Sequence, residues 1–139
     1  IPKGYHIESN VIHEIAIGDP GQFGGASGAV PVFVPSAFNC LATISNTASF
    51  QVLWRPPFIT SRIGGDCCHL NGLAMDGTRA TFVTMTSTSA TLGGWRDDRR
   101  EGGVIMDLAS QETVATGLSM PHSPRLYDGK LWVLNSGQG

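Results

Sequence analysis

Short apolar segments bounded by glycine, proline or Asp-Gly dipeptides recur along the chain. No segment keeps apolar residues at the 3.6-residue period of a helix, because Gly or Pro interrupts every candidate. The segments are instead rich in Val, Ile, Thr and Phe, which favour strands. The pattern therefore predicts an all-β chain of short strands joined by tight turns.

The predicted strands repeat with a period of about 50 residues. Aromatic–valine pairs occupy residues 33–34, 82–83 and 132–133, which are 49 and 50 residues apart. Each pair follows a segment with a shared order of residues. A histidine comes first, an aliphatic residue follows four positions later, and then come an aspartate and a turn-forming residue. These histidines are His13, His69 and His122. Two further strands follow in the first two units, and four strands per unit are typical of β-propeller blades.

The repeat divides a single domain, 1–139, into segments with different expected places in the fold. We expect an outer strand at 1–10, a first blade at 13–58, a second at 69–118 and a partial third at 122–139. The glycine-rich stretch 19–31 and the charge-balanced stretch 95–103 are predicted to be loops, and Pro35 interrupts a predicted strand.

The number of predicted blades bears on assembly. Propellers have about four to eight blades, so we expect a propeller-type arc of about three blades that a homodimer closes into a six-bladed ring. Residues 5–9 of one copy would then complete the partial blade of the other. The alternative is an open β domain of three sheets.

Composition limits the class of partner. Charged residues make up 14% of the chain, hydrophobic residues 41%, and the net charge is −2. This composition is typical of a folded domain and gives no reason to expect nucleic acid or a membrane as a partner. Three cysteines do not make a disulfide scaffold, so we expect a reduced, cytoplasmic protein.

Four stretches carry a resemblance: LWRPPFIT, CHLNGLAMDG, GGVIMDLAS and GLSMPHSPRLYDGKLWVLNSG. They resemble an uncharacterised bacterial propeller-like family with a domain-of-unknown-function label, over most of the chain from His13 onward. The resemblance implies a propeller fold and no established activity. Family members continue past Gly139, so the chain resembles a truncated or diverged member.

The three repeated histidines are the first candidate site. On the innermost strands they would converge near one axis, where three imidazoles could bind Zn²⁺. The alternative is that they hydrogen-bond the backbone between blades.

A second candidate site uses oxygen ligands. Asn71-Gly-Leu is similar to a metal-binding segment of gluconolactonase-like propellers, and that resemblance also implies a role for Glu14. Such oxygens suit Ca²⁺ or another divalent metal such as Mg²⁺. The resemblance implies a further Asp ligand, and Ser123 occupies that position here. The alternative is that Asn71 caps a turn while Glu14 is paired or solvated.

Cys67, Cys68 and His69 do not form a convincing nucleophile and base. In a strand, Cys68 and His69 would face opposite ways, and no third group is evident for Cys67. We expect buried, inert thiols.

The leading functional hypothesis is a small-molecule binding module at the central channel, lined by His13, His69, Asn71, His122 and Arg125. A metal-dependent, lactonase-like hydrolase and a structural assembly fragment without catalysis are the alternatives. Whether the chain is an enzyme stays open.

Overall fold

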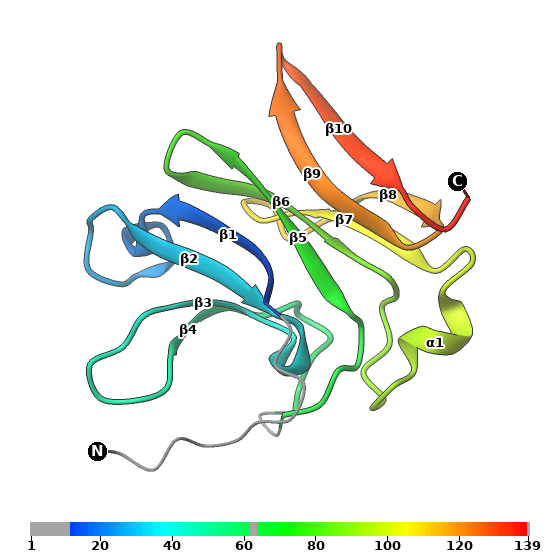
Figure 1. Cartoon of the computed structure of the whole chain (residues 1–139), viewed down its shortest axis with the longest axis horizontal. Coiled ribbons are helices and arrows are strands. Elements are labelled where there is room, and N and C mark those ends of the chain that lie inside the picture. Colours follow the sequence, from blue (N-terminus) through cyan, green and yellow to red (C-terminus); the bar gives the residue numbers. More distant parts are fainter. Residues whose placement is uncertain (1–11, 62–63, 139) are drawn as a thin grey trace.

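Ten strands in three antiparallel sheets form the framework of the computed structural model, which describes residues 12–61 and 64–138 (Figure 1). Sheet one holds β1 (Ile12–Gly18), β2 (Val30–Pro35), β3 (Leu41–Thr43) and β4 (Gln51–Trp54). Sheet two holds β5 (Leu70–Asp76), β6 (Arg79–Met85), β7 (Gly103–Asp107) and β8 (Thr113–Leu118). Sheet three is the hairpin of β9 (Pro121–Tyr127) and β10 (Lys130–Asn135). The predicted all-β fold is confirmed.

Within each sheet the strands are neighbours in chain order, the arrangement found in a propeller blade. Asp128 and Gly129 both have positive φ between β9 and β10, as a two-residue type I′ turn requires. Closure into a ring involves a second copy and stays a prediction, and the proposed outer strand at 1–10 lies outside the described residues.

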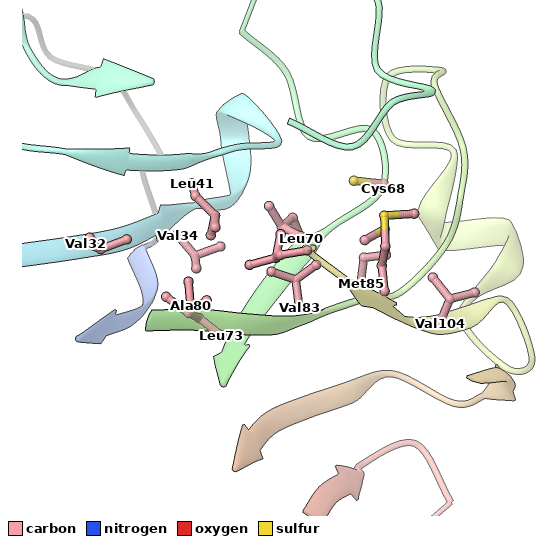
Figure 2. Close-up of a cluster of buried hydrophobic side chains, with 12 residues drawn as sticks. Val32, Val34, Leu41, Cys68, Leu70, Leu73, Ala80, Val83, Met85 and Val104 are labelled. Atoms are coloured by element: carbon pink, nitrogen blue, oxygen red, sulfur yellow. The ribbon is translucent and has the colours of Figure 1, made fainter. Parts of the chain in front are cut away.

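The hydrophobic core lies between sheets one and two. Figure 2 shows Val32, Val34 and Leu41 of sheet one gathered against Leu70 and Val83 of sheet two. All five are at most 1% exposed, and each such side chain contributes about 1.5–3 kcal/mol when fully buried. The packing fixes β1 and β2 relative to β5 and β6.

Sheet three packs on the opposite face of sheet two through a close backbone approach. A Cβ atom at Gly72 of β5 would lie 2.4 Å from Cδ of Pro124 in β9 and 2.2 Å from Oγ1 of Thr84. Only glycine fits such spacing. Because β5 packs against both β1 and β9, the first strands of the three sheets lie together (Figure 1).

Two predicted irregular stretches contain short helices. A 3-10 helix at Pro20–Phe23 begins where the side chain of Asp19 accepts a hydrogen bond from the Gly21 amide. Helix α1 (Trp95–Asp98) lies in the stretch predicted to be a solvated loop, and that prediction is wrong for these four residues. The Trp95 amide donates to the Cys67 carbonyl, and this contact brings the turn onto sheet two.

Pro35 does not interrupt β2 but ends it, and a 3-10 helix at Ser36–Phe38 follows. In the described part of the chain, no helix is long and apolar enough to cross a membrane.

Candidate metal centre

Three histidines from three sheets meet at one end of the first strands. His13 lies on β1, His122 on β9, and His69 immediately before β5. One ring nitrogen of each lies within 4.8 Å of those of the other two. The ring centroids are separated by 4.8, 5.8 and 6.2 Å. The structure thus brings together the residues that the repeat singled out, and their role as ligands stays a prediction.

A carboxylate fixes the orientation of His69. Asp66 accepts a hydrogen bond from the His69 amide at 2.8 Å through Oδ1, and its Oδ2 lies 2.6 Å from Nδ1 of the ring. This local turn gives His69 a positive φ of 51°. The ring also stacks on Trp95, with centroids 4.3 Å apart and planes 23° apart. His69 is therefore held by an acidic and an aromatic partner together.

A backbone carbonyl orients His122. Its Nδ1 donates to the carbonyl of Met120 at 2.8 Å. Carbonyl oxygens and ionised carboxylates only accept hydrogen bonds, so Nδ1 carries the proton in both His69 and His122. In the neutral imidazole, Nε2 then has the free lone pair. Histidines that bind metals almost always have such a partner on their other ring nitrogen.

The surroundings of His13 favour its neutral form. Burial lowers the pKa of its imidazole, and the neighbouring rings of His69 and His122 lower it further because a second positive charge there would be repelled. A neutral imidazole is the form that binds a metal.

The donor set determines which metals fit. Three imidazoles suit Zn²⁺ and related transition metals, whereas Ca²⁺ and Mg²⁺ prefer oxygen ligands. With Zn–N bonds of about 2.0–2.1 Å, tetrahedral geometry separates the ligand nitrogens by roughly 3.3 Å. The ligand nitrogens, at 4.8 Å or less, would have to move closer together around such an ion.

Glu14 and Arg125, both predicted site residues, are joined to each other. Nη1 of Arg125 donates to Oε2 of Glu14 at 2.9 Å, and Nη2 donates to Oε1 at 3.1 Å. A guanidinium thus lies where a hard cation bound to Glu14 would lie. This is the paired state that the sequence left open for Glu14, and its role as a metal ligand stays a prediction.

Asn71 is buried beside the cluster. Its Oδ1 accepts a hydrogen bond from Oγ1 of Thr84 at 2.7 Å. Among residues 12–61 and 64–138, its Nδ2 has no hydrogen-bond partner, and the same holds for Nε1 of Trp95 and Oγ1 of Thr86. The amide oxygen of Asn71 thus already accepts one hydrogen bond, and its role as a metal ligand stays a prediction.

Burial affects the two adjacent thiols, Cys67 and Cys68. It raises the pKa of Cys68 to about 12 and also raises the pKa of Cys67, and both thiols are free. Cys67 and Cys68 lie in a bend before β5, so the strand alternation used in the sequence argument does not apply to them. Sequence reasoning missed Asp66, which pairs with His69. Its position three residues before this histidine is the signal that could have identified it.

The comparisons with known proteins give a family and no activity. A family model described as a domain of unknown function (DUF4915) matches residues 1–139. No curated protein and no solved structure matches the chain.

Proposed function

The chain therefore belongs to the DUF4915 family, and we propose that it is a small-molecule binding module built on a divalent transition metal, with Zn²⁺ as the best fit. His13, His69 and His122 are the three protein ligands of this metal. One position of a tetrahedral ion is then left for a small molecule that offers an oxygen or nitrogen donor.

One observation carries the proposal. Ring nitrogens of three histidines, at or just before the first strands of three sheets, converge, while Nδ1 of His69 and of His122 each has a carboxylate or carbonyl partner. Histidines that served only to hydrogen-bond the backbone would not need their free nitrogens to face one another. Asp66 adds a carboxylate partner beside His69, and such a partner fixes the tautomer and orientation of a ligand imidazole.

Metal titration tests the proposal. Protein stripped with a chelator is titrated with Zn²⁺ while tryptophan emission is followed, because Trp95 stacks on His69. Zn²⁺ should bind with a one-to-one ratio, and His13→Ala, His69→Ala and His122→Ala should each reduce the affinity. Each reduction in Zn²⁺ affinity should exceed the roughly 10–100-fold that follows when a ligand histidine loses its hydrogen-bond partner.

Glu112→Ala is the matched control, because it removes an exposed carboxylate from the turn between β7 and β8. Co²⁺ in place of Zn²⁺ adds a second readout, since its visible absorption reports tetrahedral geometry. Acetohydroxamate, a small oxygen-donor ligand, should shift this absorption. A wild-type protein without affinity for either metal would overturn the proposal.

A metal-dependent hydrolase is the second candidate function. The observation that favours it is the three-histidine set, because catalytic zinc sites keep three protein ligands and one open position for water. Such a metal lowers the pKa of bound water to about 7. Zn²⁺-loaded protein should then hydrolyse simple lactones or esters, and activity should vanish in the His122→Ala variant. Lack of turnover with a confirmed metal would leave the binding module alone.

A further inference from the structure

The guanidinium of Arg125 lies where β1, β5 and β9, the first strands of the three sheets, come together. Arg125 belongs to β9, pairs with Glu14 of β1, and lies 3.5 Å through Nη1 from the carbonyl of Leu73 in β5. Nη1 also donates to the carbonyl of Pro124 at 2.8 Å. Glu14 directly follows His13, and Arg125 lies three residues after His122. The first strands of the three sheets are therefore linked by two neighbouring sets of contacts. One set consists of the histidines, and the other surrounds Arg125.

The position of this pair affects the distance between His13 and His122. These histidines lie on β1 and β9, which belong to different sheets and do not form a ladder with each other. Backbone hydrogen bonds therefore do not set their separation. The Gly72–Pro124 approach fixes β9 against β5, whereas the Glu14–Arg125 pair links β1 to β9 directly.

We infer that Glu14 and Arg125 act as a positioning clamp that holds His13 and His122 close enough to share a metal ion. The inference rests on the proposed metal site. The bidentate geometry matters, since two parallel hydrogen bonds fix orientation as well as distance. Lysine, a single point donor, would not reproduce it.

The clamp and a simple surface ion pair predict different results. Side chains of Glu14 and Arg125 are 14% and 56% exposed, and water screens the attraction of such a pair. The effect on overall stability is therefore small. A positioning role instead lowers metal affinity in a protein that remains folded.

Metal affinity in four variants tests the clamp. Arg125→Met should weaken Zn²⁺ binding by about tenfold, which is in the range for loss of a residue that supports a metal ligand without binding the metal. The circular dichroism spectrum and the urea midpoint of this variant should change little. Glu14→Gln, a milder change, should weaken binding in the same direction. Arg125→Lys should lie between wild type and Arg125→Met, and the swap Glu14→Arg with Arg125→Glu should restore most of the affinity.

Lys130→Met on β10 is the control, because it removes an exposed cation from the same hairpin. If Arg125→Met does not fold, Glu14→Gln decides the question on its own. Wild-type affinity in a folded Arg125→Met or Glu14→Gln variant would overturn the clamp and leave the metal site intact. A wild-type protein that binds no Zn²⁺ would instead overturn the proposed function on which the clamp rests.

Discussion

Asp66 contacts His69 through both carboxylate oxygens, and this contact makes it the most informative single residue near the cluster. We predict that Asp66→Asn weakens Zn²⁺ binding by about tenfold, because the amide removes the charge that makes the imidazole a better ligand. Asp97→Asn is the matched control, since Asp97 is exposed on α1. Titration followed by tryptophan emission measures both variants, and equal affinities would contradict the prediction.

Cys40 provides a test of burial that does not involve the cluster. Burial raises the pKa of its thiol from 9.0 to about 11, so little thiolate forms in the folded protein at mildly alkaline pH. We predict that Cys40 resists iodoacetamide in the native protein and reacts once urea unfolds it. Peptide mapping by mass spectrometry measures the labelling. Rapid labelling of the native protein would show that the residue is accessible.

The same shift predicts how Cys40 affects stability as the pH changes. Above about pH 9 the unfolded chain loses this proton, whereas the folded chain retains it until about pH 11. The unfolded state therefore binds fewer protons in that window, and the free energy of unfolding falls as the pH rises. Cys40→Ala should remove this part of the decline in urea titrations. If the free energy of unfolding falls equally steeply with pH in wild type and in the variant, the assignment of this decline to Cys40 is contradicted.

At the residue scale, the sequence predicted the histidine cluster in part. The repeat predicted all three histidines on the innermost strands. His13 and His122 lie on β1 and β9, whereas His69 lies just before β5. The repeat did not predict Asp66. The Asp66–His69 contact depends on a turn with positive φ at His69, and strand periodicity carries no information about such a turn.

At the scale of elements, the position of β9 on β5 depends on one glycine. We predict that Gly72→Ala destabilises the protein by about 1–3 kcal/mol, the usual effect of forcing an extra carbon into a packed site. The new methyl group would meet the Pro124 ring and the Thr84 hydroxyl. Urea unfolding measures the loss. Stability equal to wild type would show that the two sheets can separate without cost.

A second variant separates crowding from other effects of this substitution. Gly72→Ala combined with Pro124→Ala removes one of the two contacts and should recover part of the lost stability. The single Pro124→Ala variant serves as its reference. No recovery in the double variant would place the strain at Thr84 instead.

Strand positions were largely predictable because apolar segments and turn residues alternate in a regular way. The Phe33-Val34, Phe82-Val83 and Trp132-Val133 pairs lie in β2, β6 and β10. Helix α1 was not predictable from its sequence pattern. Four residues are too few to show a helical period, and contacts of Trp95 with His69 and Cys67 hold the turn in place.

At the scale of the whole molecule, β10 leaves an edge and an apolar surface available. In the described part of the chain, β10 pairs with β9 alone. Trp132 and Leu134 on β10 are 57% and 61% exposed. An unpaired antiparallel edge beside exposed apolar side chains is a template for another strand, so self-association remains the prediction that the sequence made.

The sequence predicted that residues 5–9 of a second copy complete this sheet. As a different mode of self-association, we propose that the second copy pairs with this edge, β10 against β10, around a two-fold axis, a contact that would not close a six-bladed ring. An antiparallel pair of identical strands has that symmetry, and each copy would cover the exposed Trp132 and Leu134 of the other. Trp132→Lys with Leu134→Lys should prevent the pairing, because the two-fold brings like charges together. Sedimentation velocity should show a dimer for wild type and a monomer for this variant, with Val114→Lys on the exposed face of β8 as the control. A wild-type monomer at every concentration tested, or a dimer that survives both lysines, would contradict the proposal.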